Sequence, residues 1–236
     1  MILPENKPKE RDITPKIYLI WGESMSGKTY IARTFPNPIL LNTDGNAKKV
    51  DTPSIEIKSW EMMVGALKEL QTNNTFETVI IDLIDDIKTM IEDYILKEYN
   101  QKQKKDLKSY TDIPYGGGYA QVKNIYKNFM MSLSSLNKNI IFISHIKTIS
   151  EITPMGTSNI EQPSLEERYL NMTMGRCDLV IQAKKRGSVY TYTVKDKRDK
   201  YTKEDIKDKR ILNILEQFKN IFEENNKLEI KKIGDK

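Results

Sequence analysis

Cysteine and histidine are nearly absent from this chain of 236 residues, which has one of each, Cys177 and His145. A single cysteine cannot form an internal disulfide, and one cysteine with one histidine falls short of the ligand set of the usual zinc sites. Long hydrophobic runs are also missing. The longest, such as residues 140–143, have the length of a strand and are far too short to cross a bilayer. The first sixteen residues are rich in Lys, Glu and Pro and lack the apolar stretch of a signal peptide. We therefore expect a soluble, cytoplasmic protein with no membrane partner.

Neither sign of charge dominates, because 38 Lys and Arg residues face 33 Asp and Glu residues and leave a net charge of +5. Hydrophobic residues make up 38% and charged residues 30% of the chain, which is enough apolar material for a core under a charged surface. The length fits one generous domain. The small positive charge agrees equally well with a nucleic-acid partner and with a lysine-rich surface that is merely solvated. The position of the charges has to decide between the two.

Short apolar runs alternate with segments of helical periodicity along the chain. The predicted strands are residues 16–21, 38–42, 78–82, 139–144, 178–183 and 189–194. The predicted helices include 60–70, 84–95, 122–136, and a final helix at roughly 203–224. This alternation predicts an α/β fold with a mostly parallel central sheet flanked by helices. A turn at 186–188 between the last two strands adds a C-terminal β-hairpin, followed by the final helix.

Three segments make up the predicted domain organisation. Residues 1–15 form a polar N-terminal arm, residues 16–200 the core domain, and residues 201–236 a C-terminal helix and tail. Within the core, residues 148–162 show no clear periodicity and contain Pro154 and Gly156. We expect this stretch to be a long mobile loop.

A complete phosphate-binding motif, G-x-x-x-x-G-K-[ST], occupies residues 22–29. Its glycines let the backbone curl so that successive N–H groups point at phosphate oxygens. Lys28 can reach the β and γ phosphates, and the Thr29 hydroxyl can bind Mg²⁺. A chance glycine-rich turn is the alternative, but the motif lies between a predicted buried strand and a helix, as the mechanism requires. The predicted ATP-binding residues are Gly22, Glu23, Ser24, Met25, Ser26, Gly27, Lys28, Thr29 and Tyr30.

The strand at residues 78–82 ends in a carboxylate, Asp82. With a P-loop in the same chain, Asp82 is expected to hold Mg²⁺ together with Thr29, directly or through water. Without the P-loop, an ordinary turn aspartate would be the better interpretation. Asp85 and Asp86 are interpreted as partners of the dipole of the following helix. No guanine-specific N-K-x-D segment is present, so ATP is the expected nucleotide.

Taken together, these separated segments resemble the RecA-like ATPases, and most closely the small phage-encoded proteins of the Sak single-strand-annealing type. The resemblance covers roughly residues 16–200. It implies that Asp44, which ends a strand in Leu-Leu-Asn-Thr-Asp, activates the attacking water. It also implies that His145 is the γ-phosphate sensor and that residues 146–162 form a DNA-binding loop. Residues 112–119 and 175–178 match phrases shared by phage relatives.

The same resemblance gives Lys195 and Lys197 a role between subunits. They stand where RecA-like filaments use a Lys-x-Lys element to reach the ATP of the neighbouring subunit. Because side chains two apart on a strand share a face, both ammonium groups are expected to point at the neighbour's γ phosphate. A solvated, charge-rich surface is the alternative interpretation of this stretch.

Two positions depart from the family pattern. The usual catalytic glutamate is replaced by the shorter Asp44, and the usual sensor glutamine by His145, whose charge can change near neutral pH. Both departures argue against fast hydrolysis of the RecA type and leave nucleotide binding intact. We therefore expect a slow ATPase, and the resemblance implies that DNA stimulates it. A turn aspartate and a structural histidine at a strand end are the alternatives for these two residues.

Lysines and tyrosines are interleaved after residue 100, a combination that binds backbone phosphates and stacks on exposed bases. A lysine-rich helix end is the alternative. The predicted contacts to single-stranded DNA are Lys102, Lys105, Lys108, Tyr110, Tyr115, Lys147 and Arg168.

The resemblance therefore implies an ATP-dependent single-stranded DNA-binding protein of phage recombination, working in the host cytoplasm. It would assemble into a filament or ring, hydrolyse ATP between subunits, and meet a single-strand DNA-binding protein. A P-loop small-molecule kinase is one alternative, although the chain has no evident cluster of arginines for a kinase lid. A nucleotide-gated adaptor of the helicase-loader type, with little DNA-stimulated turnover, is the other.

Overall fold

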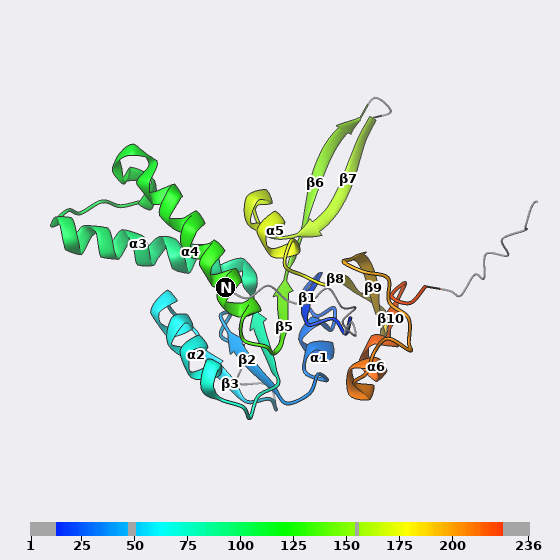
Figure 1. Cartoon of the computed structure of the whole chain (residues 1–236). Helices are drawn as coiled ribbons and strands as arrows, with labels where there is room; N and C mark the ends of the chain where they lie inside the picture. The colour runs from blue at the N-terminus through cyan, green and yellow to red at the C-terminus, as the bar shows by residue number, and fades with distance from the viewer. Residues whose placement is uncertain (1–12, 47–50, 154–155, 224–236) are drawn as a thin grey trace, which may run out of the picture.

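An eight-stranded sheet forms the centre of the computed structural model, which describes residues 13–46, 51–153 and 156–223 (Figure 1). The strand order is β10-β9-β8-β1-β5-β4-β2-β3, and all neighbours are parallel except β8 and β9. The strands are β1 (Ile17–Gly22), β2 (Pro38–Asn42), β3 (Ser54–Glu56), β4 (Thr78–Asp82), β5 (Asn139–Ser144), β8 (Leu179–Arg186), β9 (Val189–Lys197) and β10 (Phe218–Lys219). A separate antiparallel pair consists of β6 (Ile146–Thr153) and β7 (Gly156–Pro163).

Helices cover both faces of this sheet, which is why β4 and β5 are buried along their whole length. The α-helices are α1 (Lys28–Ala32), α2 (Trp60–Thr72), α3 (Ile87–Gln103), α4 (Gly117–Ser134), α5 (Glu167–Met174) and α6 (Lys209–Leu215). Short 3₁₀ turns are η2 (Ile84–Asp86), η3 (Tyr110–Asp112) and η4 (Pro114–Gly116). The predicted α/β fold, with a mostly parallel sheet, flanking helices and a C-terminal hairpin plus helix, is confirmed.

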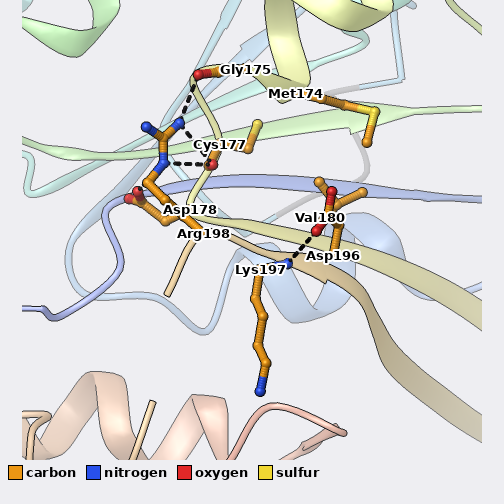
Figure 2. A pocket seen from close by; sticks show the side chains of 8 residues that line it. All are labelled: Met174, Gly175, Cys177, Asp178, Val180, Asp196, Lys197 and Arg198. Atoms are coloured by element: carbon orange, nitrogen blue, oxygen red, sulfur yellow. Dashed lines mark hydrogen bonds and ion pairs between the residues drawn. The ribbon is translucent and has the colours of Figure 1, made fainter. Parts of the chain in front are cut away.

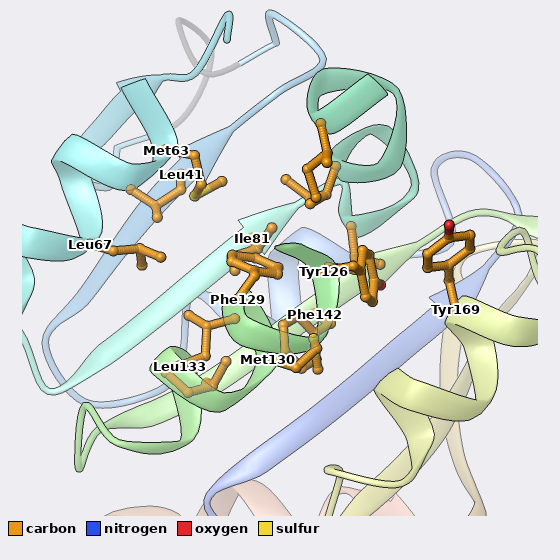
Figure 3. Close-up of a cluster of buried hydrophobic side chains, with 14 of the residues drawn as sticks. Leu41, Met63, Leu67, Ile81, Tyr126, Phe129, Met130, Leu133, Phe142 and Tyr169 are labelled. Carbon is orange, nitrogen blue, oxygen red and sulfur yellow. The ribbon is translucent and has the colours of Figure 1, made fainter. Parts of the chain in front are cut away.

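Alternating residues of β1 feed two separate cores. Leu19 and Trp21 face the larger core, which α2, α3, α4 and α5 cover, whereas Tyr18 and Ile20 face the smaller core under α1 and α6. Figure 3 shows the larger core, in which side chains of α4, including Phe129, pack onto the central strands. With a core on each face, the sheet is held firmly in place. The carboxyl ends of its parallel strands, and the loops that follow them, are therefore held in place as well, and these loops carry the candidate site.

The prediction of a mobile loop at residues 148–162 is wrong. The segment forms the β6–β7 hairpin, in which Ile146 pairs with Pro163 and the ladder runs out to Thr153 and Gly156 (Figure 1). The hairpin projects from the body and buries no continuous apolar face, and Ile149 and Ile160 are each 40% exposed. Hydrophobic periodicity therefore gave no sign of these two strands.

The long C-terminal helix is also a wrong prediction, because α6 ends at Leu215. Asp208 caps its start by accepting a hydrogen bond from the Arg210 backbone N–H at 2.8 Å. The chain then turns back into the sheet, where Phe218 pairs with Tyr192 as part of β10. Apolar residues between 201 and 221 complete the smaller core, so the described chain beyond residue 200 is continuous with the sheet.

The ends of the chain are described only in part. Residues 1–12 of the predicted arm lie outside the described residues. The end of the arm is held to the sheet, because the Tyr18 hydroxyl donates a hydrogen bond to the Pro15 carbonyl at 2.6 Å. Residues 224–236 of the predicted tail lie outside as well. Within the described part of the chain, no helix combines the length and apolar character needed to cross a membrane.

Candidate functional site

The loop between β1 and α1 has the backbone of a phosphate-binding loop. A Cβ at Gly22 would lie 2.1 Å from the Ala183 carbonyl oxygen of β8, so no side chain fits there. Gly27 has a φ of 85°, and a Cβ on it would meet the Tyr190 ring at 2.7 Å. Both glycines are thus required by close packing against the β8–β9 hairpin as well as by the curl of the loop.

Two polar side chains inside the loop are suited to bind phosphate oxygens. The Lys28 ammonium donates hydrogen bonds to the carbonyls of Gly22 at 2.9 Å and Glu23 at 2.7 Å, and burial lowers its pKa. The Ser26 hydroxyl is buried and has no hydrogen-bond partner in the described chain. A lysine held only by neutral carbonyls and an unpartnered buried hydroxyl fit the phosphate oxygens of a nucleotide.

Thr29 and Asp82 meet across the sheet, as predicted for a magnesium pair. The Thr29 hydroxyl donates to Asp82 Oδ2 at 2.6 Å. Burial raises the pKa of Asp82 to about 6, while the Thr29 hydroxyl and Lys28 act in the opposite direction. Within the described ranges no three His, Cys, Asp or Glu side chains group into a metal site of their own. The pair therefore fits Mg²⁺, which usually takes one or two protein ligands and completes its shell with phosphate oxygens and water.

A cavity of about 450 Å³ above the P-loop brings the predicted catalytic side chains together. Lys28, Asp82, Asp44 and His145 all line it. Asp44, Asp82 and His145 come from the ends of β2, β4 and β5, and Lys28 begins α1 after β1, so sheet topology places all four at one edge. These residues are far apart in the sequence, and their spacing does not show that they are neighbours. The fold brings the predicted P-loop, magnesium and catalytic positions together around one cavity.

Asp44 is held in a fixed orientation at the rim of this cavity. Its Oδ1 accepts hydrogen bonds from the Asn42 amide at 2.7 Å and the Asn46 backbone N–H at 2.9 Å, and its Oδ2 accepts from the Asn46 amide at 2.8 Å. Burial acts to raise its pKa, but the hydrogen bonds from Asn46 and Asn42 outweigh it and the pKa is lowered. The carboxylate is thus ionised, and the geometry agrees with both a turn residue and a water-binding base.

His145 follows β5 and is held through its backbone. Its N–H donates to Asp85 Oδ2 at 2.8 Å, and its Nδ1 lies 3.8 Å from the same oxygen. Asp85 Oδ1 accepts from the Ser144 hydroxyl at 2.5 Å, and burial raises the pKa of this aspartate. Asp86 accepts from the Thr43 hydroxyl at 2.5 Å. Asp85 and Asp86 stand in the first turn of η2, where the sequence interpretation as dipole partners places them, and they also join the ends of neighbouring strands.

Residues of the β8–β9 hairpin that sequence reasoning missed lie against the P-loop. The Tyr192 hydroxyl donates to the Gly27 carbonyl at 3.0 Å. The rings of Tyr30 and Tyr190 stack with centroids 6.3 Å apart, and Lys185 Nζ lies 5.1 Å from the Tyr190 centroid. Tyr30, Tyr190 and Lys185 line a second cavity of about 410 Å³ beside the loop. The sequence predicts the hairpin but contains no signal that it folds back onto the P-loop.

The prediction that Lys195 and Lys197 share a face is wrong. The β8–β9 register shifts at this point, with Ile181 opposite Val194 and Val180 opposite Asp196, which leaves Lys195 as an extra residue. Such a bulge breaks the alternation of side chains along a strand. The Lys197 ammonium donates to the Ile221 carbonyl at 3.1 Å. Lys195 instead lines a cleft with Trp21, on the other side of the sheet.

Figure 2 shows the surroundings of this bulge, with Lys197 extending away from Arg198. The Arg198 guanidinium donates to the Gly175 carbonyl at 2.7 Å and lies 3.2 Å from Asp178 Oδ1. Asp178 Oδ2 in turn accepts the Ile17 backbone N–H at 3.0 Å. The segment at residues 175–178 therefore serves to hold the start of β1 against the hairpin.

The predicted DNA contacts fall on two different parts of the chain. Lys102, Lys105, Lys108 and Tyr115 lie in the segment where α3 ends and the chain turns toward α4. We call this segment the α3–α4 tip (Figure 1). Tyr110 instead packs back along α3, where the Lys88 ammonium lies 5.8 Å from its ring centroid. Two of these lysines pair with acids, Lys102 with Glu98 at 2.5 Å and Lys108 with Asp106 at 2.6 Å. Tyr115 is fully exposed.

The remaining two candidates lie near the root of the β6–β7 hairpin. The Lys147 ammonium donates to the Leu165 carbonyl, so it braces the hairpin. Arg168 is exposed on α5. The structure therefore does not gather all seven predicted DNA contacts on a single element.

A P-loop between a buried parallel strand and a helix, with a carboxylate from a nearby parallel strand, defines a P-loop nucleotide-binding protein of the α/β class. This chain belongs to the AAA domain family, whose profile matches residues 14–222. A search of curated proteins found no match. Among solved structures, the chain is similar to the RadB recombinase at 12% identity and a TM-score of 0.44, covering 78% of this chain and 83% of that one. A likeness this distant carries no argument about function.

Proposed function

We propose that this protein is a RecA-type ATPase that binds single-stranded DNA in its ATP-bound form and assembles with copies of itself during recombination. The observation that carries the proposal is the cavity in which Lys28, Asp82, Asp44 and His145 meet. It combines a phosphate-binding cation, a magnesium ligand, an ionised carboxylate and a histidine at the end of a neighbouring strand. This set of groups suits hydrolysis of a terminal phosphate.

Each side chain has a role that follows from its present contacts. Lys28 exchanges its two carbonyl partners for oxygens of the β and γ phosphates. Thr29 and Asp82 hold Mg²⁺, which neutralises phosphate charge when it is bound. Asp44 orients the attacking water and accepts its proton, and His145 contacts the γ phosphate. The tight hydrogen bonding of Asp44 and its lowered pKa make it a weak base, in keeping with slow turnover.

The base of the nucleotide is proposed to lie in the second cavity, beside Tyr30 and Tyr190. Two nearly parallel rings next to the loop offer a planar face for stacking. Lys185 adds a donor for ring nitrogens. Any base can stack on these rings, so binding here needs no guanine-specific motif. A purine is favoured because its larger ring system makes more stacking contact.

Exposed apolar side chains around the P-loop support assembly. Met25 is 82% and Tyr30 65% exposed, and both line the second cavity, while Val189, which is 62% exposed, directly precedes Tyr190 of that cavity. Such a cluster usually marks a contact surface. A neighbouring subunit seated here would cover bound ATP and couple assembly to nucleotide. Lys195 and Lys197 face opposite ways, so they do not act as a pair on one neighbouring ATP.

ATP hydrolysis measured with and without single-stranded DNA tests this function. We expect slow turnover that DNA stimulates and that Lys28→Ala abolishes while the protein stays folded. ATP binding without turnover under either condition would favour a nucleotide-gated adaptor, an outcome that the hydrogen bonds on Asp44 also allow. Phosphate transfer that requires a small-molecule acceptor would favour a kinase.

A further inference from the structure

A cleft of about 690 Å³ lies between the β6–β7 hairpin and the β8–β9 hairpin, outside the nucleotide cavities. Its floor includes Trp21, the residue that directly precedes the P-loop, and its walls carry Lys184 from β8 and Lys195 from the β9 bulge. Thr148 and Asn159 line it from the hairpin side. Thr148, Asn159 and Glu161 belong to the 146–162 segment that the resemblance makes a DNA-binding loop, whereas none of the seven individually predicted DNA contacts lines this cleft.

Hydrogen-bond donors outnumber acceptors among the described residues that line this cleft. Glu161 contributes the one carboxylate, and its Oε2 already accepts from Lys184 Nζ at 2.7 Å and from the Gln182 amide at 2.8 Å. Lys195 makes no hydrogen bond or ion pair within the described chain, although its charge lowers the pKa of Glu161. The buried indole N–H of Trp21, whose side chain is only 4% exposed, has no acceptor in the described chain. A buried donor without a partner is rare in folded proteins, and here it points to an acceptor atom on a ligand.

The ligand that suits these donors is an anion that offers several acceptor oxygens. The cleft has two ammonium groups against one carboxylate, so its charge is positive. The hairpin that walls it has the opposite character, because residues 146–163 contain one lysine and two glutamates. That single lysine, Lys147, is occupied by the Leu165 carbonyl. A polyanion is therefore attracted to the root of the hairpin and not to its outer surface.

We propose that this cleft binds a backbone phosphate of single-stranded DNA, with Lys195, Lys184 and the Trp21 indole N–H as donors. The inference rests on the proposed function, from which it takes the identity of the ligand. Lys195 follows Val194, which faces the smaller core, so its side chain lies on the same side of the sheet as Trp21, and the β9 bulge turns Lys197 to the other side. Because Trp21 is followed directly by Gly22 of the P-loop, the DNA and nucleotide sites share a strand end.

Glu161 has the role of a competitor in this arrangement. Its carboxylate holds Lys184 while no DNA is bound and repels a phosphate that enters. Removing its charge with Glu161→Gln frees Lys184 and is expected to tighten DNA binding by a fewfold. Glu151→Gln is the matched control, because Glu151 is an exposed residue of the same hairpin that does not line the cleft.

The test is the affinity of the full chain for a fluorescently labelled oligo-dT strand, measured over a salt series with a non-hydrolysable ATP analogue and Mg²⁺. Lys184→Gln/Lys195→Gln is expected to weaken binding roughly tenfold. It is also expected to flatten the plot of log affinity against log salt by about 0.7 for each phosphate that is no longer neutralised. Affinity for the ATP analogue is expected to stay unchanged. Lys219→Gln on edge strand β10 makes the same kind of charge change elsewhere and is expected to have no effect.

A second measurement reports on the cleft itself. The chain has two tryptophans, so Trp60→Phe leaves Trp21 as the one indole. Oligo-dT is expected to change the Trp21 emission in this background, and Lys184→Gln/Lys195→Gln is expected to remove the change.

The two proposals fail in different ways. Wild-type protein that binds no oligo-dT at all would overturn the proposed function and the cleft with it. Wild-type protein that binds oligo-dT, with unchanged affinity and salt dependence in the double lysine variant, would overturn the cleft alone.

Discussion

The P-loop edge of the sheet and the α3–α4 tip hold their polar groups in opposite ways. At the P-loop edge, Lys28 and Asp82 are buried and bonded within the chain, and close packing leaves no room for a side chain at Gly22. At the tip, Tyr115 is fully exposed and the charged side chains pair with their neighbours along the chain. The first region is organised for one ligand before the ligand arrives, whereas the lysines of the second are exposed on the surface. We therefore expect substitutions to have large, specific effects at the first and small, additive ones at the second.

Lys28→Ala is expected to have the largest effect. It removes the one side-chain cation that the P-loop offers to the β and γ phosphates. ATP turnover and ATP-dependent DNA binding should both be lost, while the circular dichroism spectrum and the melting temperature stay close to wild type. Lys185→Ala, in the neighbouring cavity, is a useful comparison, since it should weaken nucleotide binding without abolishing it.

Asp82→Asn should separate the stability of the fold from the binding of the nucleotide. Burial raises the pKa of Asp82 from 3.8 to about 6, so the folded state prefers its protonated form. Its contribution to the free energy of unfolding therefore falls as pH rises from about 4 to about 6, by on the order of 3 kcal/mol. Without nucleotide, Asp82→Asn should lose this pH dependence and be more stable than wild type at pH 7.

The same variant should lose Mg²⁺-dependent ATP binding. Chemical denaturation of both proteins between pH 4 and pH 8, with and without ATP and Mg²⁺, measures the two effects together. Identical pH profiles for wild type and Asp82→Asn would contradict the buried, protonatable carboxyl.

Asp44→Asn keeps the shape of the side chain and removes the proton acceptor. Turnover should fall roughly a hundredfold while ATP affinity changes little. Asp93→Asn, an exposed aspartate on α3, makes the same chemical change away from the cavity and should leave turnover unaltered. If Asp44→Asn hydrolyses ATP at the wild-type rate, Asp44 is a turn residue that Asn42 and Asn46 simply hold in place.

The α3–α4 tip should give the smallest effects. Replacing Lys102, Lys105 and Lys108 with Gln is expected to weaken oligo-dT binding by a fewfold and to lower its salt dependence. Because Lys102 and Lys108 already pair with acids, Lys105→Gln alone should account for most of the change. Equal losses of affinity in the three single variants would show that these exposed ion pairs do not compete with DNA.

The sequence was sufficient where local chemistry determines structure. The spacing of the P-loop and the apolar strand before it predict the phosphate site, and Asp82 follows from the strand that it ends. It was insufficient where a tertiary contact decides. The β6–β7 hairpin buries no apolar face that periodicity could reveal, and α6 ends early because Phe218 pairs with β9.

Some of the candidate site was equally hidden. A one-residue bulge at Lys195 reverses the face of the sheet on which Lys197 lies, and no sequence pattern marks this bulge. The packing of Tyr190 and Tyr192 against Gly27 depends on how the β8–β9 hairpin folds back over the loop. Asp85 looks like a helix-start residue in the sequence, yet in the fold it bonds to Ser144 and His145.

The most direct test of the central claim is the affinity of wild-type protein for oligo-dT with and without Mg²⁺ and a non-hydrolysable ATP analogue. The cavity that joins Lys28, Asp82, Asp44 and His145 predicts binding at least about tenfold tighter with the nucleotide, a difference of about 1.4 kcal/mol. Lys28→Ala should bind DNA equally in both conditions. Equal affinity of the wild-type protein with and without the nucleotide would contradict the claim that this site controls DNA binding.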